Sequence, residues 1–316
     1  MVVREDWRDR LRPVVVSHGW EDAFAPDRSR LHATFDWTGT DDPSPWLTVP
    51  DAVDLGDALH PDGWAGVRAA NHDLALQARD LLCEALAIDP LDFNKCLAVA
   101  KDRGWSITQI LNTHEHGDHI GGNKGMVAAT GAKIIAHENA GKRIPNMDRG
   151  VGAGDIIKVG ATVDLECMDT PGHTMSHICL LSHTDQPALF SGDTLFNAGA
   201  GNCHNGGHPA ELYETFDTQL STLRDDTLVY PGHDYLINNL RFTLDREPDN
   251  EVARQMILDY EDQDPANALV TTLAQEREMN TFFRLDSPSM IARLKDDFPD
   301  IGDRPDERTV FLKLRE

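Results

Sequence analysis

The sequence predicts a layered α/β fold to which a helical segment is appended. From about residue 71, short apolar runs separated by turn residues alternate with amphipathic stretches, a pattern typical of strands and helices packed in layers. After about residue 236 the strand pattern fades and helical periodicity continues. We therefore expect three parts: an N-terminal extension over residues 1–65, an α/β domain over 66–235 and a helical domain over 236–316.

The composition narrows the classes of function. The 316 residues include 53 acidic and 29 basic side chains, which gives a net charge of -24. Because nucleic-acid binding depends on clustered Lys and Arg, this charge argues against a nucleic-acid partner. The chain has no apolar run long enough to cross a bilayer and no secretory signal at its start, so we expect no membrane partner and a cytoplasmic location. An acidic surface of this kind would also suit a saline habitat.

The N-terminal extension has a composition of its own. It is rich in Asp, Pro, Trp and His and shows weak periodicity, so we expect little regular structure in it. Trp20, Trp37 and Trp46 would be a liability if exposed. Covering a neighbouring part of the chain, or forming a homodimer, would bury them.

The elements of the α/β domain follow one another in a regular order. Residues 73–76 and 84–89 predict the two strands of a hairpin, and residues 92–103 predict a helix with one apolar face. The later strands are expected at 107–112, 133–136, 155–159, 162–168, 177–181, 188–191 and 227–230, with helices near 122–130 and over about 14 residues from Pro209.

The helical domain is expected to contain three further helices. They cover residues 251–262, 269–279 and 288–297, and Ser287 is a plausible N-cap for the last of them.

Four potential metal ligands lie within six residues directly after the strand at 107–112. In the loop Thr113-His-Glu-His-Gly-Asp-His119, alternate side chains such as His114 and His116 share a side of an extended backbone, while Asp118 and His119 can turn toward a second point. This spacing is typical of a chelating loop.

Three further segments repeat this placement at or just after a predicted strand. They are Thr170-Pro-Gly-His173, Ser191-Gly-Asp193-Thr194 and Tyr230-Pro-Gly-His233, and the small residues before each ligand allow close backbone approach. Together with the loop they supply five histidines and two aspartates, which is enough for two metal ions that share one carboxylate.

These motifs resemble those of the metallo-β-lactamase fold, an αββα sandwich, and within that superfamily those of glyoxalase II. The resemblance extends from about residue 71 to the C-terminus and includes Ile120-Gly-Gly-Asn123, Pro171-Gly-His-Thr-Met-Ser-His177 and Ser191-Gly-Asp-Thr-Leu-Phe196. The segments Pro231-Gly-His-Asp-Tyr235 and Asn280-Thr-Phe-Phe-Arg284 are similar to glyoxalase II in particular.

The resemblance implies a role for each ligand and a reaction. His114, His116 and His173 would bind a first metal, Asp118, His119 and His233 a second, and Asp193 would bridge them. Zinc is the ion that we expect, although the same ligands suit iron or manganese. A metal-bridging hydroxide, oriented by Asp118, would attack the thioester of an S-(2-hydroxyacyl)glutathione and release D-lactate and glutathione. His177 and Asp89 are candidates for supporting the ligands.

The residues that would contact the thiol carrier match the family only in part. Tyr235 and Arg315 correspond to positions that contact glutathione in glyoxalase II. The loop after the bridging aspartate departs from the family pattern, since Asn202 replaces its cation and His204 its tyrosine. The sequence is therefore also compatible with a different acyl-thiol substrate or with weaker binding of glutathione.

Alternative functions of the same fold differ in their ligands. A persulfide dioxygenase-like oxidoreductase uses one iron held by two His and one Asp, so the complete second site at Asp118, His119 and His233 argues against it. The helical tail argues against a lactonase or β-lactamase, and the complete ligand set argues against a binding protein without activity.

Overall fold

The computed structural model describes residues 49–264 and 267–316. The chain divides into two units, Met1–Leu76 and Gln77–Glu316, each of which is described by itself. Trp20, Trp37 and Trp46 lie outside the described residues.

The described part of the first unit is helical. Helix α3 (Val49–Ala58) is followed by α4 (Gly63–Leu82), which continues into the second unit. The indole nitrogen of Trp64 donates a hydrogen bond to the carbonyl of Val53 at 2.8 Å. The backbone amide of Trp64 donates to Oδ1 of Asp57 at 3.1 Å. The expectation of little regular structure is therefore wrong for residues 49–65.

The hairpin expected from residues 73–76 and 84–89 is also wrong. Residues 73–76 belong to α4, because no Gly or Pro interrupts the chain between Gly66 and Pro90 and its Ala, Leu, Gln and Arg residues favour a helix. Strand β1 (Glu84–Ile88) instead pairs in parallel with β2 (Ser106–Asn112).

The first sheet contains strands β1 to β4 in sequence order, and all its pairs are parallel. Parallel neighbours require crossovers, which helices α5 (Phe93–Arg103) and α7 (Asn123–Thr130) provide. Strand β3 covers Lys133–His137, the 3₁₀ helix η3 covers Glu138–Arg143, and β4 covers Arg149–Val151. The predictions at 92–103, 107–112, 122–130 and 133–136 are confirmed to within one or two residues.

The second sheet has the order β12-β11-β8-β7-β6-β5. Its strands are β5 (Ile156–Val159), β6 (Val163–Asp169), β7 (Ile178–Ser182), β8 (Ala188–Gly192), β11 (Leu228–Pro231) and β12 (Thr271–Thr272), and β9 (Leu195–Phe196) pairs with β10 (Gly199–Ala200) beside it. Strand β12 was not expected. The helix predicted from residue 269 begins only at Leu273, because Thr272 and Gln275 form a capping box there.

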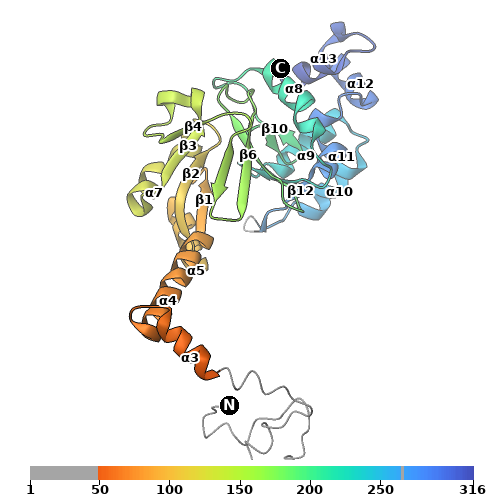
Figure 1. Cartoon of the computed structure of the whole chain (residues 1–316). Helices are drawn as coiled ribbons and strands as arrows, with labels where there is room; N and C mark the ends of the chain where they lie inside the picture. Colours follow the sequence, from red (N-terminus) through yellow and green to blue (C-terminus); the bar gives the residue numbers. More distant parts are fainter. Residues whose placement is uncertain (1–48, 265–266) are drawn as a thin grey trace, which may run out of the picture. The chain divides into compact units, whose positions relative to one another are not determined.

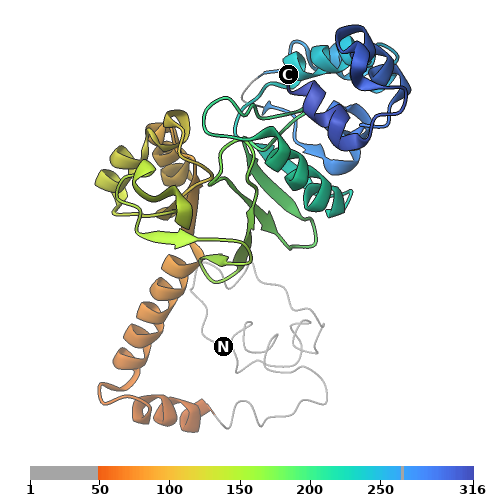
Figure 2. The same ribbon diagram turned by 90° about the horizontal axis from the view of Figure 1, so that it is seen from above.

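The two sheets pack face to face between layers of helices (Figures 1 and 2). Apolar side chains of both sheets, among them Leu111, Ile135, Leu165 and Ile178, form the core between them. A second cluster lies under α5 and α7 on the other face of the first sheet. This is the αββα arrangement expected from the sequence.

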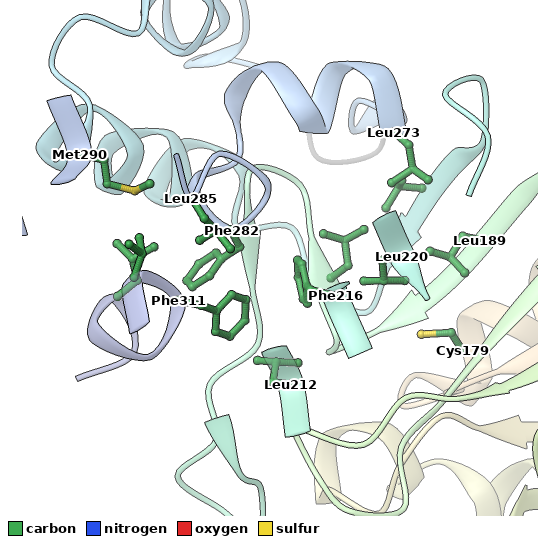
Figure 3. Close-up of a cluster of buried hydrophobic side chains, with 14 of the residues drawn as sticks. Cys179, Leu189, Leu212, Phe216, Leu220, Leu273, Phe282, Leu285, Met290 and Phe311 are labelled. Carbon is green, nitrogen blue, oxygen red and sulfur yellow. The ribbon is translucent and has the colours of Figure 1, made fainter. Parts of the chain in front are cut away.

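Helices α8 (Pro209–Thr218), α11 (Leu273–Met279), α12 (Pro288–Asp297) and α13 (Glu307–Leu314) share a hydrophobic core with the second sheet (Figure 3). Buried side chains of α9 (Leu236–Arg246) and α10 (Glu251–Tyr260) form a separate cluster with Ala198 and Met279. The rings of Phe216 and Phe282 lie 5.4 and 5.1 Å from that of Phe311, centre to centre. Ser287 precedes α12 as its N-cap residue, but its side chain makes no capping hydrogen bond. None of the helices in the described ranges is long and apolar enough to span a membrane.

Candidate metal centre

The candidate ligands follow strands whose carboxyl ends meet at one edge of the sandwich. Strands β8 and β11 are parallel, and β6 runs in the same direction because β7 is antiparallel to both β6 and β8. His173, Asp193 and His233 lie in the segments directly after β6, β8 and β11. The remaining ligands come from the loop after β2 and the short helix α6 (Gly117–Ile120).

The structure brings all seven predicted ligands together. Their ligand atoms form three overlapping groups, in each of which the atoms lie within 4.8 Å of one another. The groups are His114, His116 and His173; His114, His119 and Asp193; and Asp118, His119 and His233.

The distances between ligand atoms divide the site into two halves that meet at Asp193. In the first half, Nδ1 of His116 lies 3.0 Å from Nε2 of both His114 and His173. In the second, Nε2 of His233 lies 3.2 Å from Nε2 of His119 and 3.3 Å from Oδ2 of Asp118. Asp193 Oδ1 is 3.3 Å from His119 Nε2.

Asp193 also reaches the histidines through its other oxygen. Its Oδ2 atom lies 3.5 Å from Nε2 of His173 and 3.4 Å from Nε2 of His233. The carboxylate therefore stands between the two halves.

In four of these histidines, the ring nitrogen that faces away from the centre of the site (the outer nitrogen) contacts a protein group. The other ring nitrogen, which faces the centre, is therefore available as a ligand. His173 Nδ1 donates to the carbonyl of Asn202 at 2.6 Å, and His116 Nε2 to that of Asn205 at 3.0 Å. The outer nitrogens of His119 and His114 lie 2.8 Å from Asp89 Oδ2 and 3.0 Å from Thr113 Oγ1, respectively. This arrangement is typical of metal-binding histidines.

The centre of the site fits a cation. Asp193 Oδ1 is buried and accepts no hydrogen bond from any residue that the structure describes, although buried carboxylates are normally paired. Inward-facing imidazole nitrogens and carboxylate oxygens surround it. Nitrogen and oxygen donors of these two types suit Zn²⁺, Fe²⁺ or Mn²⁺.

The pKa values also indicate a place for positive charge. Burial lowers the pKa of His119, but the nearby carboxylates of Asp193 and Asp89 outweigh it and raise that pKa to about 10. A hydrogen bond with Asp193 raises the pKa of His233. Burial lowers the pKa of His114 and of His173. Without metal, His119 therefore stays protonated beside Asp193. A metal cation bound there would balance the negative charge of Asp193 in place of that proton.

Asp89 and His177 form hydrogen bonds with residues of the candidate site. Asp89 accepts hydrogen bonds from His119 and from the amide and hydroxyl of Thr113, at 2.8, 2.8 and 2.7 Å. His177 Nε2 accepts from the amide of Asp193 at 3.1 Å. Gly192 has a φ of +48°, and a Cβ there would lie 2.6 Å from Thr113 Oγ1, so this turn requires glycine.

A cavity of about 360 Å³ opens onto the site. Its lining comprises His116, Gly117, Asp118, His173, Asp193, Phe196, Asn202, Asn205, His233 and Tyr235. The ring of Tyr235 stacks on His233, with 5.3 Å between ring centres, and meets Phe196 edge to face at 5.2 Å. One wall of the cavity is therefore aromatic.

Two of the expected substrate residues do not line this cavity. The guanidinium of Arg315 lies 5.4 Å from the ring centre of Phe282 and donates to the carbonyl of Ala200 at 3.4 Å. His204 is exposed, and its amide donates to Asn202 Oδ1 at 3.1 Å. Their roles in substrate binding stay predictions.

Sequence reasoning missed three residues of the site. Phe196 forms part of the cavity wall, Asn205 offers a backbone carbonyl to His116, and Glu115 bonds with residues beyond His173. Phe196 was within a recognised motif, and its apolar side chain beside the ligands was the available signal. A carbonyl contact has no side-chain signal in the sequence.

Two protein families match successive parts of the chain. Residues 75–233 match the metallo-beta-lactamase superfamily. Residues 234–316 match the hydroxyacylglutathione hydrolase C-terminus.

Relatives match about three quarters of the chain. A hydroxyacylglutathione hydrolase of Polaromonas sp. is 69% identical over 74% of this chain and 89% of its own length. One from Nitrosococcus oceani is 60% identical over the same shares. A third, from Maricaulis maris, is 39% identical over 73% of this chain and 88% of its own.

Proposed function

Since the chain belongs to the metallo-β-lactamase superfamily and, within it, to the hydroxyacylglutathione hydrolases, we propose that it hydrolyses S-(2-hydroxyacyl)glutathione. The products would be glutathione and a 2-hydroxy acid such as D-lactate. The observation that carries this proposal is the convergence of seven ligand-type side chains on one site, five of which line the cavity. The relatives of 69% and 60% identity, together with the match of residues 234–316 to the hydroxyacylglutathione hydrolase C-terminus, support the thioester substrate.

Two divalent ions would be held by the two halves of the site. His114, His116 and His173 would hold the first ion, Asp118, His119 and His233 the second, and Asp193 both. Such ions supply the acidity that makes water a nucleophile near neutral pH and the charge that polarises a carbonyl. Zinc is the ion that we propose, because its borderline character suits mixed imidazole and carboxylate ligands.

The chain's own groups hold and orient what reacts. Asp118 lies at the cavity with its side chain 53% exposed and Oδ2 3.3 Å from His233, so its carboxylate can accept a hydrogen bond from the attacking water. Asp89 fixes the ring of His119, and His177 fixes the backbone of Asp193. The ligands thus keep their directions before substrate arrives, which reduces the reorganisation that catalysis requires.

The leaving group needs little help from the protein. A thiol has a pKa of about 8.5, so thiolate leaves without a strong general acid. No nucleophilic Ser or Cys is required by this chemistry. Phe196 and Tyr235 offer an aromatic wall against which the acyl or thiol part can pack. Asn202 lines the same cavity.

The glutathione carrier is expected to be held with fewer charged contacts than the family pattern provides. No Lys or Arg lines the cavity among the described residues. Loss of a charged hydrogen bond to a carboxylate weakens binding by about 1.5–3 kcal/mol. Arg315 would contribute if its guanidinium turned from Ala200 toward the carrier. A cytoplasmic location and a homodimer stay predictions from the sequence.

A panel of substrates tests the reaction class. The purified protein, loaded with Zn²⁺, is offered acyl thioesters of glutathione and of other thiols, together with a lactone and a β-lactam. We expect cleavage of the glutathione thioesters, and an Asp193→Ala variant should lose metal and turnover together. Failure to cleave any thioester, or oxygen uptake by the iron-loaded protein with glutathione persulfide, would overturn the proposal.

A further inference from the structure

Glu115 lies between two of the ligands but points away from the cavity. It separates His114 from His116 in the loop after β2, yet it is absent from the cavity lining. Its Oε2 atom accepts hydrogen bonds from the hydroxyls of Ser176 at 2.7 Å and of Thr174 at 3.2 Å. Both hydroxyls belong to the loop that follows His173. Glu115 thus connects the two loops that supply the three histidines of the first half of the site.

Arg143, at the end of η3, adds a third element to this contact. Its Nε lies 3.1 Å from Oε1 of Glu115. Its Nη2 donates to Ser176 Oγ at 3.0 Å and to the carbonyl of Asn139 at 2.8 Å. The guanidinium therefore holds both the acid and one of the hydroxyls that the acid binds, and it ties them to the segment after β3.

The contact requires a carboxylate rather than any polar side chain. One oxygen of Glu115 faces the guanidinium and the other faces two hydroxyls, so neither position favours an N–H group. The Glu115 side chain is 12% exposed, while Ser176 and Thr174 are buried. Hydrogen bonds to a charged acceptor shielded from water are stronger than neutral ones at the surface.

The contact concerns one half of the site only. His119 is held by Asp89, and His233 follows β11 on another segment. In the part of the chain that the structure describes, Glu115 makes its hydrogen bonds and ion pair with Thr174, Ser176 and Arg143 and none with the ligands of the second half, Asp118, His119 and His233. A change at Glu115 should therefore act unequally on the two metals.

We propose that Glu115 is a positioning residue that fixes His114 and His116 against His173, so that the first metal ion depends on it and the second does not. The inference rests on the proposed metal ligands. Supporting groups of this kind change metal affinity by about 10- to 100-fold. Because the effect is on binding, activity should return when the variant is given excess metal.

The test is a titration of the metal-free full chain with Zn²⁺ against a chelating dye, which yields two dissociation constants. For Glu115→Ala we expect one constant to rise about 10- to 100-fold and the other to stay within about two- to threefold. Adding Asp118→Asn to this variant should also weaken binding of the second metal ion. Glu115→Gln keeps one acceptor for the hydroxyls and should lose less affinity than Glu115→Ala.

Two controls separate positioning from general destabilisation. Glu138→Gln neutralises an exposed acid of η3 and should leave both constants unchanged. Ser176→Ala removes a hydroxyl partner from the opposite loop. It should weaken binding of the same metal ion as Glu115→Ala does. Combined with Glu115→Gln, its effect should be less than additive, because the two residues share one contact.

The outcomes distinguish this inference from the proposed function. Wild-type affinity for both ions in Glu115→Ala, or equal weakening of both, would overturn the inference even if the wild type cleaves thioesters. If Glu115→Ala does not fold, the same comparison is made with Glu115→Gln and Ser176→Ala. A wild type that binds two ions but cleaves no thioester would overturn the proposed function and leave the selective loss in Glu115→Ala intact.

Discussion

The Nδ1 atom of His119 lies 2.8 Å from Oδ2 of Asp89, which stands at the end of strand β1. Asp89 has a φ of +47°, a conformation that residues other than glycine adopt rarely. The same carboxylate holds the amide and hydroxyl of Thr113. Through this one side chain the end of β1 fixes both the start of the ligand loop and the direction of His119.

Replacement of Asp89 by Asn should weaken the second metal ion. All three groups that face the carboxylate can donate, so an amide NH₂ would oppose a donor. We expect a loss of metal affinity of about 10- to 100-fold, measured by competition with a chelator. Asp102→Asn, which changes an exposed acid of α5, is the matched control. Equal affinity in the two variants would contradict this role of Asp89.

Metal binding should release a proton. In the metal-free protein the pKa of His119 is raised to about 10, so the ring is protonated at pH 7 to 9 and must lose that proton to become a ligand. Apparent metal affinity should therefore fall about tenfold for each pH unit below 10. Calorimetric titration in buffers of different ionisation enthalpy counts the protons released. A metal-binding constant independent of pH would contradict the prediction that a protonated His119 becomes a metal ligand.

The same shift predicts how the stability of the metal-free protein depends on pH. The folded pKa of His119, about 10, lies above its ordinary value of 6.5. The stabilisation of the folded state by protonated His119 and its carboxylate partners is therefore fully present below pH 6.5. It is lost as pH rises through about 10. Urea unfolding at a series of pH values should show it, and a His119→Gln variant should lack that part of the pH dependence.

Tyr235 should affect substrate binding more than turnover. Its ring is 44% exposed and lies at the cavity against Phe196 and His233. Loss of an aromatic contact in Tyr235→Ala should raise KM about 2- to 10-fold at unchanged metal content. Tyr235→Phe keeps the ring and should behave nearly as the wild type. A lower kcat with constant KM in Tyr235→Ala would contradict this role.

The C-terminal helices and the second sheet should unfold together. Phe311 of α13 is fully buried against Phe216 and Phe282, so Phe311→Ala should reduce the free energy of unfolding by about 3–5 kcal/mol. Leu258→Ala, at a side chain 71% exposed, should change it by less than about 0.5 kcal/mol. Urea unfolding followed by circular dichroism measures both. Separate transitions for helices and sheet would contradict a shared core.

The candidate metal ligands could be predicted from the sequence because His and Asp residues recur there at a close spacing or just after predicted strands. His114, His116 and Asp118 are closely spaced, and His173 and His233 follow small residues after strands. The supporting geometry was less visible. Contacts made by a backbone carbonyl, such as that of Asn205 with His116, do not depend on residue type.

The errors in the fold have local physical causes. Residues 73–76 show an alternation that suits a strand, but the absence of breakers lets α4 continue through them. Strand β12 has only two residues, Thr271 and Thr272, too few to give a periodic pattern. The capping box at Thr272 and Gln275 was readable from the sequence and marks the true start of α11.

The most direct test of this account is hydrolysis of S-D-lactoylglutathione by the purified full chain, with bound metal determined by elemental analysis on the same sample. We expect efficient turnover with close to two metal ions per chain, and the loss of both turnover and metal in Asp193→Ala. A fully metal-loaded protein that left this thioester intact would contradict it and move the search to other thiol carriers, lactones and β-lactams.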